Sequence, residues 1–409
     1  MLDDLGAEDS LPKALRDYAL IADGERGVLV GPHGEYAWMC FPSWDSPPAF
    51  AGLLGGPGAY AVQPAPGRWV WGGYYEDRGL IWHSRWVTGG AILECREALA
   101  RPAAPDRAVI LRTCRAVRGR SRVRALLDVR IGHGASRMGD PRRDGPDWTA
   151  GGGGASLRWR GADGAVVRAG RDGGPVLELA FDLDEGETRD LVLEIAEGGA
   201  RGPLDADDLW EATERDWHGA VPDCRDTIAP RDARLAYSVL TGLTASGGGM
   251  VAAATTALPE RSDEGRNFDY RYAWIRDQCF AGRAVALHGG PPRLLRGAVE
   301  FVSARVLADG EGLKPAYTVT GGRCRPRAPA TCPAIPAPGR SSGTRRASSS
   351  SWTRWGRRCC SSPPPPSTTA GSRRRWRPPA SRPARSRAAG PGPRRASGRS
   401  TTTCGRIRA

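Results

Sequence analysis

Residues 324–409 of this 409-residue chain contain little that a folded core could bury. They hold no Leu, Val, Phe, Met or Tyr, and their charged side chains are 20 Arg with no Lys, Asp or Glu. A segment so poor in apolar side chains cannot offset the conformational entropy that folding removes. We therefore expect folded structure only before about residue 323, and a disordered Arg/Pro/Ser-rich tail over residues 323–409.

The formal net charge of +14 comes from this tail. Without its 20 arginines, the chain has 39 basic against 45 acidic side chains, so the part expected to fold is mildly acidic. By composition alone, such a tail is typical of nucleic-acid binding, and that alternative predicts steeply salt-dependent binding that is lost on truncation at Gly322. We nevertheless expect no nucleic-acid partner, because the genetic code offers another origin for the tail.

Every residue type in the tail except Ile335 and Ile407 has a codon with C or G in the middle. This composition arises when the third, GC-biased codon position of a GC-rich gene is read as the second. The excess of Arg over Lys, 57 against 2, indicates such a gene. We therefore interpret residues 323–409 as an out-of-frame, low-complexity product of a one-base error near Arg323.

Residues 1–14 form an acidic leader without the basic and apolar regions of a secretory signal. No later run approaches the length of a membrane span, so we expect a cytoplasmic protein with no membrane partner. No two cysteines have the Cys-x-x-Cys spacing of a metal site, and we expect no disulfide framework. Five of them lie in apolar or aromatic settings where a buried free thiol is usual, namely Cys40, Cys95, Cys114, Cys224 and Cys279.

Residues 15–200 alternate short apolar runs with Gly, Pro and Asp. This pattern is typical of short strands joined by tight turns, and no helical period interrupts it. It predicts an N-terminal antiparallel β-sandwich. The expected strands are Ala59–Val62, Trp69–Trp71, Leu80–Val87, Ala91–Cys95, Ala108–Cys114, Val123–Val129, Val176–Phe181 and Leu191–Ile195.

The hydrophobic period becomes helical after residue 200. Residues 201–224 predict a linker helix with acids in its first turn and a docking face that contains Trp210 and Trp217. Further helices follow, and we expect their apolar faces to lack partners. They are Pro230–Ser246, ended by Gly247–Gly249, and, approximately, Ile275–His288 and Arg293–Leu307.

The stretch Glu264–Phe280 concentrates aromatic, Arg and Asp side chains in a loop that enters a helix. A pyranose offers an apolar C–H face and a ring of hydroxyls, so flat aromatics and bidentate charged groups are suited to hold it. The adjacent Arg276 and Asp277 can give a donor and an acceptor to one sugar ring. The plain alternative is a structural ion pair beside a buried Trp274.

The string Asp-Tyr-Arg-Tyr-Ala-Trp-Ile-Arg-Asp in this stretch resembles the Asp-Tyr-x-Tyr-x-Trp-x-Arg-Asp signature of glycoside hydrolase family 15, the glucoamylases, glucodextranases and bacterial α,α-trehalases. The resemblance extends over about residues 15–322. It implies that the sugar site binds the non-reducing glucose. The substrate-binding side chains that we expect are Tyr270, Trp274, Arg276 and Asp277.

The resemblance also implies a fold and an activity. The fold is a β + α multidomain protein, in which the sandwich is followed by an incomplete (α/α)6 toroid that begins in residues 225–322. The activity is inverting hydrolysis of a terminal α-glucosidic bond in a trehalose, maltodextrin or isomaltose-type substrate, without a cofactor or metal.

Inverting hydrolysis requires two carboxylates that flank the scissile bond. In this family the acid belongs to a Trp-Glu motif, which back-translation places in the unread frame around Gly398 and Arg399, and the base lies further downstream. We therefore expect no catalytic residue in this chain and no activity, which leaves a non-catalytic carbohydrate-binding pseudo-enzyme as an alternative. Four acids near the signature are poor substitutes, namely Glu260, Asp263, Glu264 and Asp269.

Overall fold

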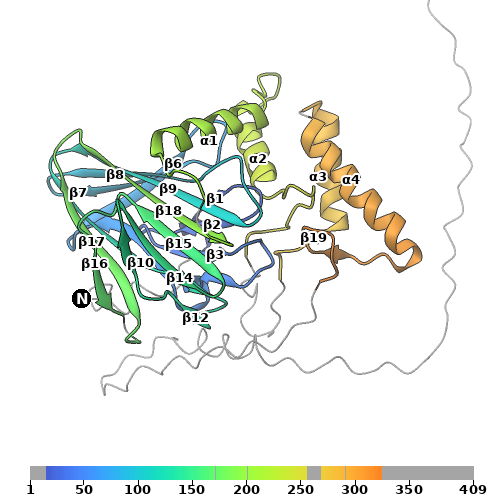
Figure 1. The fold of residues 1–409 in the computed structure, drawn as a ribbon. Coiled ribbons are helices and arrows are strands. Elements are labelled where there is room, and N and C mark those ends of the chain that lie inside the picture. The colour runs from blue at the N-terminus through green and yellow to red at the C-terminus, as the bar shows by residue number, and fades with distance from the viewer. Residues whose placement is uncertain (1–14, 171, 200, 256–268, 291, 325–409) are drawn as a thin grey trace, which may run out of the picture. The chain divides into compact units, whose positions relative to one another are not determined.

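The computed structural model describes residues 15–170, 172–199, 201–255, 269–290 and 292–324 (Figure 1). Strands occupy the first part of these residues and helices the second, as the sequence predicts. The expected leader and almost all of the expected tail lie outside the described residues. Among the described helices, none is both long and apolar enough to cross a bilayer.

Antiparallel strands form three main sheets within residues 15–199. One sheet consists of β1 (Ala19–Ala22), β2 (Gly27–Val30), β3 (Tyr36–Cys40) and β4 (Pro48–Phe50). A second consists, in order, of β16 (Val166–Ala169), β17 (Pro175–Leu183), β10 (Ser121–Asp128) and β5 (Ala59–Pro64). The third consists, in order, of β13 (Arg142–Asp144), β14 (Asp147–Gly152), β15 (Ala155–Arg160), β18 (Thr188–Glu197), β9 (Arg107–Arg118), β8 (Ile92–Leu99), β7 (Trp82–Thr88) and β6 (Trp69–Tyr75).

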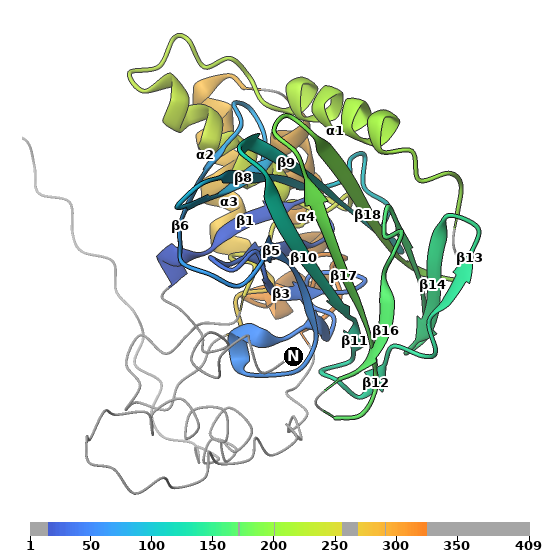
Figure 2. The ribbon, with the colours of Figure 1, turned by 90° about the vertical axis from the view of Figure 1, so that its left-hand side faces the viewer.

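One apolar core joins these sheets. Tyr60 and Val123, which face inward from the sheet of β16, β17, β10 and β5, lie in this core. Trp86 and Trp159 of the eight-stranded sheet lie in the same core. Figure 2 shows β10, β17 and β16 side by side in the sheet that also contains β5. The predicted antiparallel β region is confirmed. The short pair β11 (Arg130–Ile131) and β12 (Ser136–Arg137) and strands β13 to β16 were not predicted.

A fully buried ion pair lies in this core. Arg112 donates from Nη2 to Glu97 Oε2 at 2.7 Å, and neither side chain is exposed to solvent. The guanidinium also lies 4.0 Å from the centre of the Tyr36 ring and 4.5 Å from that of Tyr60. Buried charges are tolerated only when they are paired and hydrogen-bonded, so these contacts hold the strands in one register.

The other face of the eight-stranded sheet is covered by helices, because residues along β9 and β18 alternate between the two cores. Helix α1 (Ala206–Ala220) is capped by Asp205 and lies along β9 and β18 (Figure 1). Trp217 on α1 is almost fully buried. The predicted docking face of the linker helix is confirmed.

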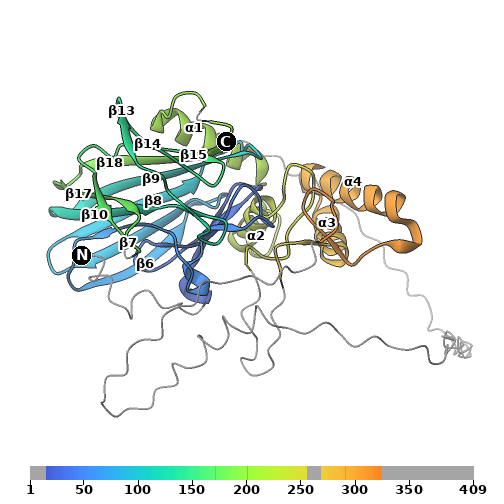
Figure 3. The ribbon, with the colours of Figure 1, turned by 60° about the horizontal axis from the view of Figure 1, so that its bottom comes forward.

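Three further helices follow, and the strands β19 (Ala273–Trp274) and β20 (Ala316–Tyr317) pair beside them. Helices α3 (Ile275–His288) and α4 (Pro292–Asp309) pack together (Figure 3). The expected helix Pro230–Ser246 ends earlier, at Gly242, and buries Tyr237 and Ser238 while Leu235 is exposed. The helix bounds are α2 (Pro230–Gly242), α3 (Ile275–His288) and α4 (Pro292–Asp309), and 3-10 turns lie at Leu15–Asp17, Gly52–Leu54 and Gly310–Gly312.

The glycines after α2 serve a purpose that the sequence did not predict. They were expected to end the helix, but a Cβ at Gly248 would lie 2.4 Å from the Gly297 carbonyl oxygen, and one at Gly249 would lie 2.5 Å from the Val319 carbonyl oxygen. Real Cβ atoms do not approach backbone atoms so closely. The glycines therefore allow this turn to pack against α4 and the segment that follows it.

The prediction that the apolar faces of these helices lack partners is correct only in part. Val285, Leu294 and Leu295 pack in the core that covers the eight-stranded sheet, whereas other apolar side chains of α3 and α4 are exposed. The largest exposed fractions are 86% for Leu307, 77% for Leu287 and 64% for Phe280. Cys279 is exposed on the same helix as Phe280, which corrects the expectation that it is buried. The other four cysteines expected to be buried free thiols are so, and Cys95 lies opposite Cys114 with 3.9 Å between the sulfur atoms.

A network of charged side chains ties α1 to the sheet. His83 on β7 donates from Nε2 to Glu76 Oε1 at 2.7 Å and from Nδ1 to Glu94 Oε1 at 3.0 Å. Arg96 bridges from Glu76, at 2.6 Å, to Glu214 on α1, also at 2.6 Å. Burial opposes the positive charge on His83, but the hydrogen bonds to both glutamates outweigh it and raise the pKa of His83 to about 9.

This network predicts how stability depends on pH. Because the folded pKa of His83 lies above its ordinary value of 6.5, its contribution is complete below pH 6.5 and is lost as the pH rises through about 9. We expect His83→Gln to lower the free energy of unfolding by about 2 to 3 kcal/mol near pH 6 and to flatten the decline above it. Denaturant unfolding between pH 5 and pH 10 measures both effects.

The matched control is His218→Gln, at an exposed position on α1. This variant should keep the stability and the pH profile of the unaltered chain. An unchanged profile in His83→Gln would show that the network does not stabilise the fold.

Candidate functional site

The signature loop, residues 269–274, lies between two extended segments. On one side, Ala252 donates its amide to the Tyr272 carbonyl at 3.1 Å, and Ala253 donates to that of Tyr270 at 3.0 Å. On the other side, β19 pairs with β20, and Ala273 lies opposite Tyr317. The backbone of the loop is therefore fixed on both sides before α3 begins at Ile275.

Arg271 clamps this loop to the β region. Its guanidinium donates to both oxygens of Asp269, at 2.9 and 2.8 Å, and from Nη1 to the Ser46 carbonyl at 2.9 Å and to Cys40 Sγ at 3.2 Å. The side chain is almost completely buried. Burial works against its charge, but Cys40 and Asp269 outweigh that effect and raise the pKa of Arg271, so the clamp stays charged.

Trp38 contacts both the segment that pairs with this loop and the Arg271 side chain. Its Nε1 donates to the Ala254 carbonyl at 3.0 Å, and its ring lies 5.7 Å from the Arg271 guanidinium. Only 1% of Trp38 is exposed. Strand β3 therefore holds both the loop and the extended segment that pairs with it.

Three of the four predicted sugar-binding side chains lie together at the start of α3. Arg276 Nε donates to Asp277 Oδ1 at 2.7 Å, and this hydrogen bond raises the pKa of Arg276. The Arg276 side chain is 70% exposed and that of Asp277 28%. The guanidinium lies 5.8 Å from the Trp274 ring, whose Nε1 is buried without a hydrogen-bond partner among the described residues.

The fourth side chain, Tyr270, is half-buried in the same loop. Among the described residues, no hydrogen bond, ring stacking or cation–π contact joins the Tyr270 ring to Trp274, Arg276 or Asp277. The ion pair expected under the plain alternative does form, but it faces solvent rather than the core. Both groups therefore keep hydrogen-bonding capacity for a ligand.

Gln278 is a positioning residue that the sequence did not reveal. It is buried, and its Oε1 accepts from the Met250 amide at 2.8 Å while its Nε2 donates to the Gly248 carbonyl at 2.9 Å. It thereby fixes the first turn of α3. Its place directly after the Arg-Asp pair was the one available sign of this role.

Of the four acids considered as catalytic substitutes, the structure describes only Asp269, and both of its carboxylate oxygens accept hydrogen bonds from Arg271. Glu260, Asp263 and Glu264 lie outside the described residues. Among the described residues, no three His, Cys, Asp or Glu side chains gather as a metal site would require. The arrangement at the start of α3 is thus suited to binding hydroxyl groups.

Two sequence families match separate parts of this chain. Residues 9–139 match the family described as trehalase-like, N-terminal, and residues 235–326 match glycosyl hydrolases family 15. The first match covers much of the β region. The second contains the signature loop and all of α3 and α4.

Curated relatives and a solved structure agree with these matches. A trehalase of Mycobacterium tuberculosis is 30% identical over 65% of this chain and 43% of its own length, and a trehalase of Mycolicibacterium smegmatis is 29% identical over 65% and 44%. A bacterial glucoamylase crystallised with acarbose has a similar fold, with a TM-score of 0.54 at 10% identity, over 77% of this chain and 53% of the other.

This chain therefore spans less than half the length of the mycobacterial relatives that it matches. The solved structure supports the order of the fold, a β-rich region followed by helices. The signature string, both family matches and these relatives agree with one another. Residues 235–326 are similar to glycoside hydrolase family 15, and residues 9–139 are similar to the trehalase-like N-terminal family.

Proposed function

We propose that this chain comes from a hydrolase of terminal α-glucosidic bonds, and that its signature loop binds the non-reducing glucose. The observation that carries the proposal is the solvent-facing Arg276–Asp277 pair at the start of α3, beside the Trp274 ring. Tyr270, in the same loop, completes the proposed subsite. The trehalases among the relatives make trehalose the first substrate to test, ahead of maltodextrin and isomaltose-type glucosides.

The chemistry of these groups suits a glucose ring. Asp277 accepts hydrogen bonds from two hydroxyls, Arg276 donates to a third oxygen, and the Trp274 ring covers C–H groups. The Asp277 carboxylate lies in the first turn of α3, where the helix dipole stabilises its charge. Because Arg271 and Gln278 already hold the loop and the helix, little ordering entropy opposes binding.

Hydrolysis itself needs a general acid and a general base. We assign both groups to the reading frame that the present chain does not use. In an inverting reaction, one carboxylic acid protonates the glycosidic oxygen as the C–O bond breaks, and a carboxylate takes a proton from the water that attacks the anomeric carbon. We propose that the present chain lacks both groups and does not catalyse hydrolysis. The end of the family match at residue 326, close to the suspected frame error, supports this proposal.

The first prediction of this proposal concerns the binding of trehalose. Removing the charge of Asp277 in Asp277→Asn should weaken trehalose binding about ten- to a hundredfold, because hydrogen bonds to a charged group are lost. Isothermal titration calorimetry on the full chain measures this change.

A matched control is Asp232→Asn. Asp232 is the third residue of α2, as Asp277 is of α3, so both changes remove an acid from the same helical position. The control should keep the affinity of the unaltered chain. Equal affinities in Asp277→Asn and the unaltered chain would refute the proposed subsite.

The second prediction concerns catalysis. The 409-residue chain should release no glucose from trehalose, maltose or isomaltose. A chain with one base restored near codon 323, and translated past the present stop, should hydrolyse one of them, and the glucose unit that water attacks should appear as the β anomer, since inversion changes the anomer. From trehalose the leaving unit keeps its α configuration, so α- and β-glucose should appear in equal amounts. Proton NMR of the first turnovers distinguishes the anomers, and release of glucose by the 409-residue chain would contradict the account.

A further inference from the structure

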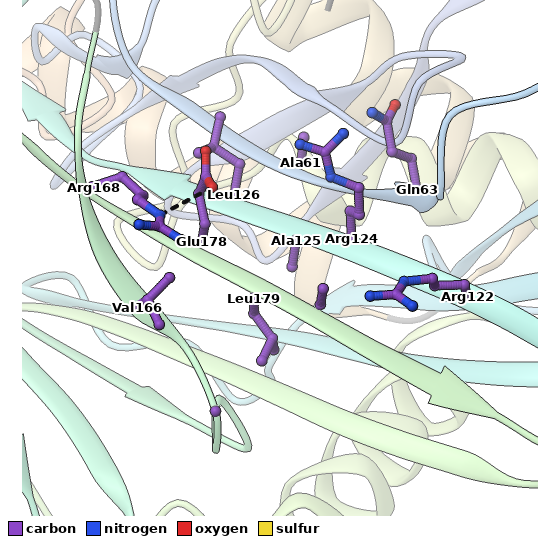
Figure 4. Close-up of a pocket in the computed structure, with 12 residues that line it drawn as sticks. Ala61, Gln63, Arg122, Arg124, Ala125, Leu126, Val166, Arg168, Glu178 and Leu179 are labelled. Atoms are coloured by element: carbon purple, nitrogen blue, oxygen red, sulfur yellow. Dashed lines mark ion pairs between the residues drawn. The ribbon is translucent and has the colours of Figure 1, made fainter. Parts of the chain in front are cut away.

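A hollow lies on the outer face of the sheet formed by β16, β17, β10 and β5 (Figure 4). Its volume is about 320 Å³, and its lining residues belong to β5, β10, β16, β17 and the turn before β16. The small residues Ala61, Ala180 and Gly164 leave this space open. The volume suits a small metabolite.

Positive charge dominates the hollow. Arg122, Arg124 and Arg168 line it with one acid, Glu178. Arg168 Nε lies 3.9 Å from Glu178 Oε2, too far for a hydrogen bond, and Arg122 Nη1 is 4.0 Å from an oxygen of Asp182. Both ion pairs are loose, so these arginines keep donors for a ligand.

Arg124 has no ion-pair partner among the described residues. It lies opposite Gln63 on β5 and opposite Ala180 on β17. In Figure 4 its side chain extends between Gln63 and the Arg168–Glu178 pair. It is half-buried, so it has given up part of its water without gaining a carboxylate.

Gln63 adds an unsatisfied acceptor beside this donor. Its Oε1 is buried and has no hydrogen-bond partner among the described residues. Most buried polar atoms in proteins are paired, so an unpaired amide oxygen next to an unpaired guanidinium indicates a missing ligand. The complementary molecule has an anionic group for the arginines and a hydroxyl for Gln63.

We propose that this hollow binds a small hydroxylated anion of sugar-acid size. Arg124 binds its carboxylate or phosphate group through the guanidinium fork, with Arg122 alongside, and a ligand hydroxyl donates to Gln63 Oε1. The apolar side chains of Leu126 and Val166 contact the carbon skeleton. The acids that flank the arginines and the small volume disfavour an extended polyanion such as a nucleic acid.

Calorimetric titration of the full chain tests the site with D-galacturonate and galactose 6-phosphate, which present the two anionic groups on one ring. Neutral galactose is the reference ligand and should not bind here. Arg124→Ala should weaken binding of the better anion about tenfold or more. Arg124→Lys, which keeps the charge but loses the fork, should have an intermediate effect.

Two further variants separate ligand binding from effects on folding. Glu178→Gln removes the negative charge and frees Arg168, so it should tighten binding about two- to threefold, a gain that damage to the fold would not produce. Arg68→Ala, at an exposed arginine elsewhere in the β region, should leave binding unchanged.

Three results would overturn the proposal. These are no measurable binding of either anion, equal binding by the unaltered chain and Arg124→Ala, and tight binding of a single-stranded oligonucleotide that Arg124→Ala abolishes. The last would identify a nucleic-acid surface instead. Asp277→Asn should leave anion binding intact, so failure of this site and failure of the proposed glucose subsite can be told apart.

Discussion

The buried guanidinium of Arg271 is the interaction on which the described part of the sugar site depends. Taking a charged group out of water is costly unless every donor finds an acceptor, and this one finds Asp269, Cys40 and Ser46. Two of these partners belong to the β region and one to the signature loop. The cost of leaving the cation unpaired therefore keeps the loop attached to the sheet, and the start of α3 with it.

This arrangement explains why the β region and the first helices are linked so closely. Trp38 and Arg271 connect β3 to the loop, while α1 covers the eight-stranded sheet through Trp217. The glucose-binding groups that we propose lie in this loop and at the start of α3, and residues of the β region hold the loop in place. By contrast, Leu287 and Leu307 on α3 and α4 remain exposed.

Much of this could be predicted where local pattern and tertiary structure agree. The approximate bounds of α3 followed from its helical pattern, and the β region followed from alternating apolar runs. Strands such as β16 escaped because all four residues are exposed, so no alternation marks them. The roles of Arg271 and Gln278 depend on partners far away in the sequence, which no local pattern reveals.

Hydrogen exchange shows whether Arg271 holds the signature loop in place. Arg271→Lys keeps the charge but loses the guanidinium fork. We expect the Ala252 and Ala253 amides, which pair with the loop, to exchange about tenfold faster or more in this variant, while the Val192 amide in the eight-stranded sheet keeps its rate. Unchanged exchange at Ala252 and Ala253 would show that Arg271 does not hold the loop.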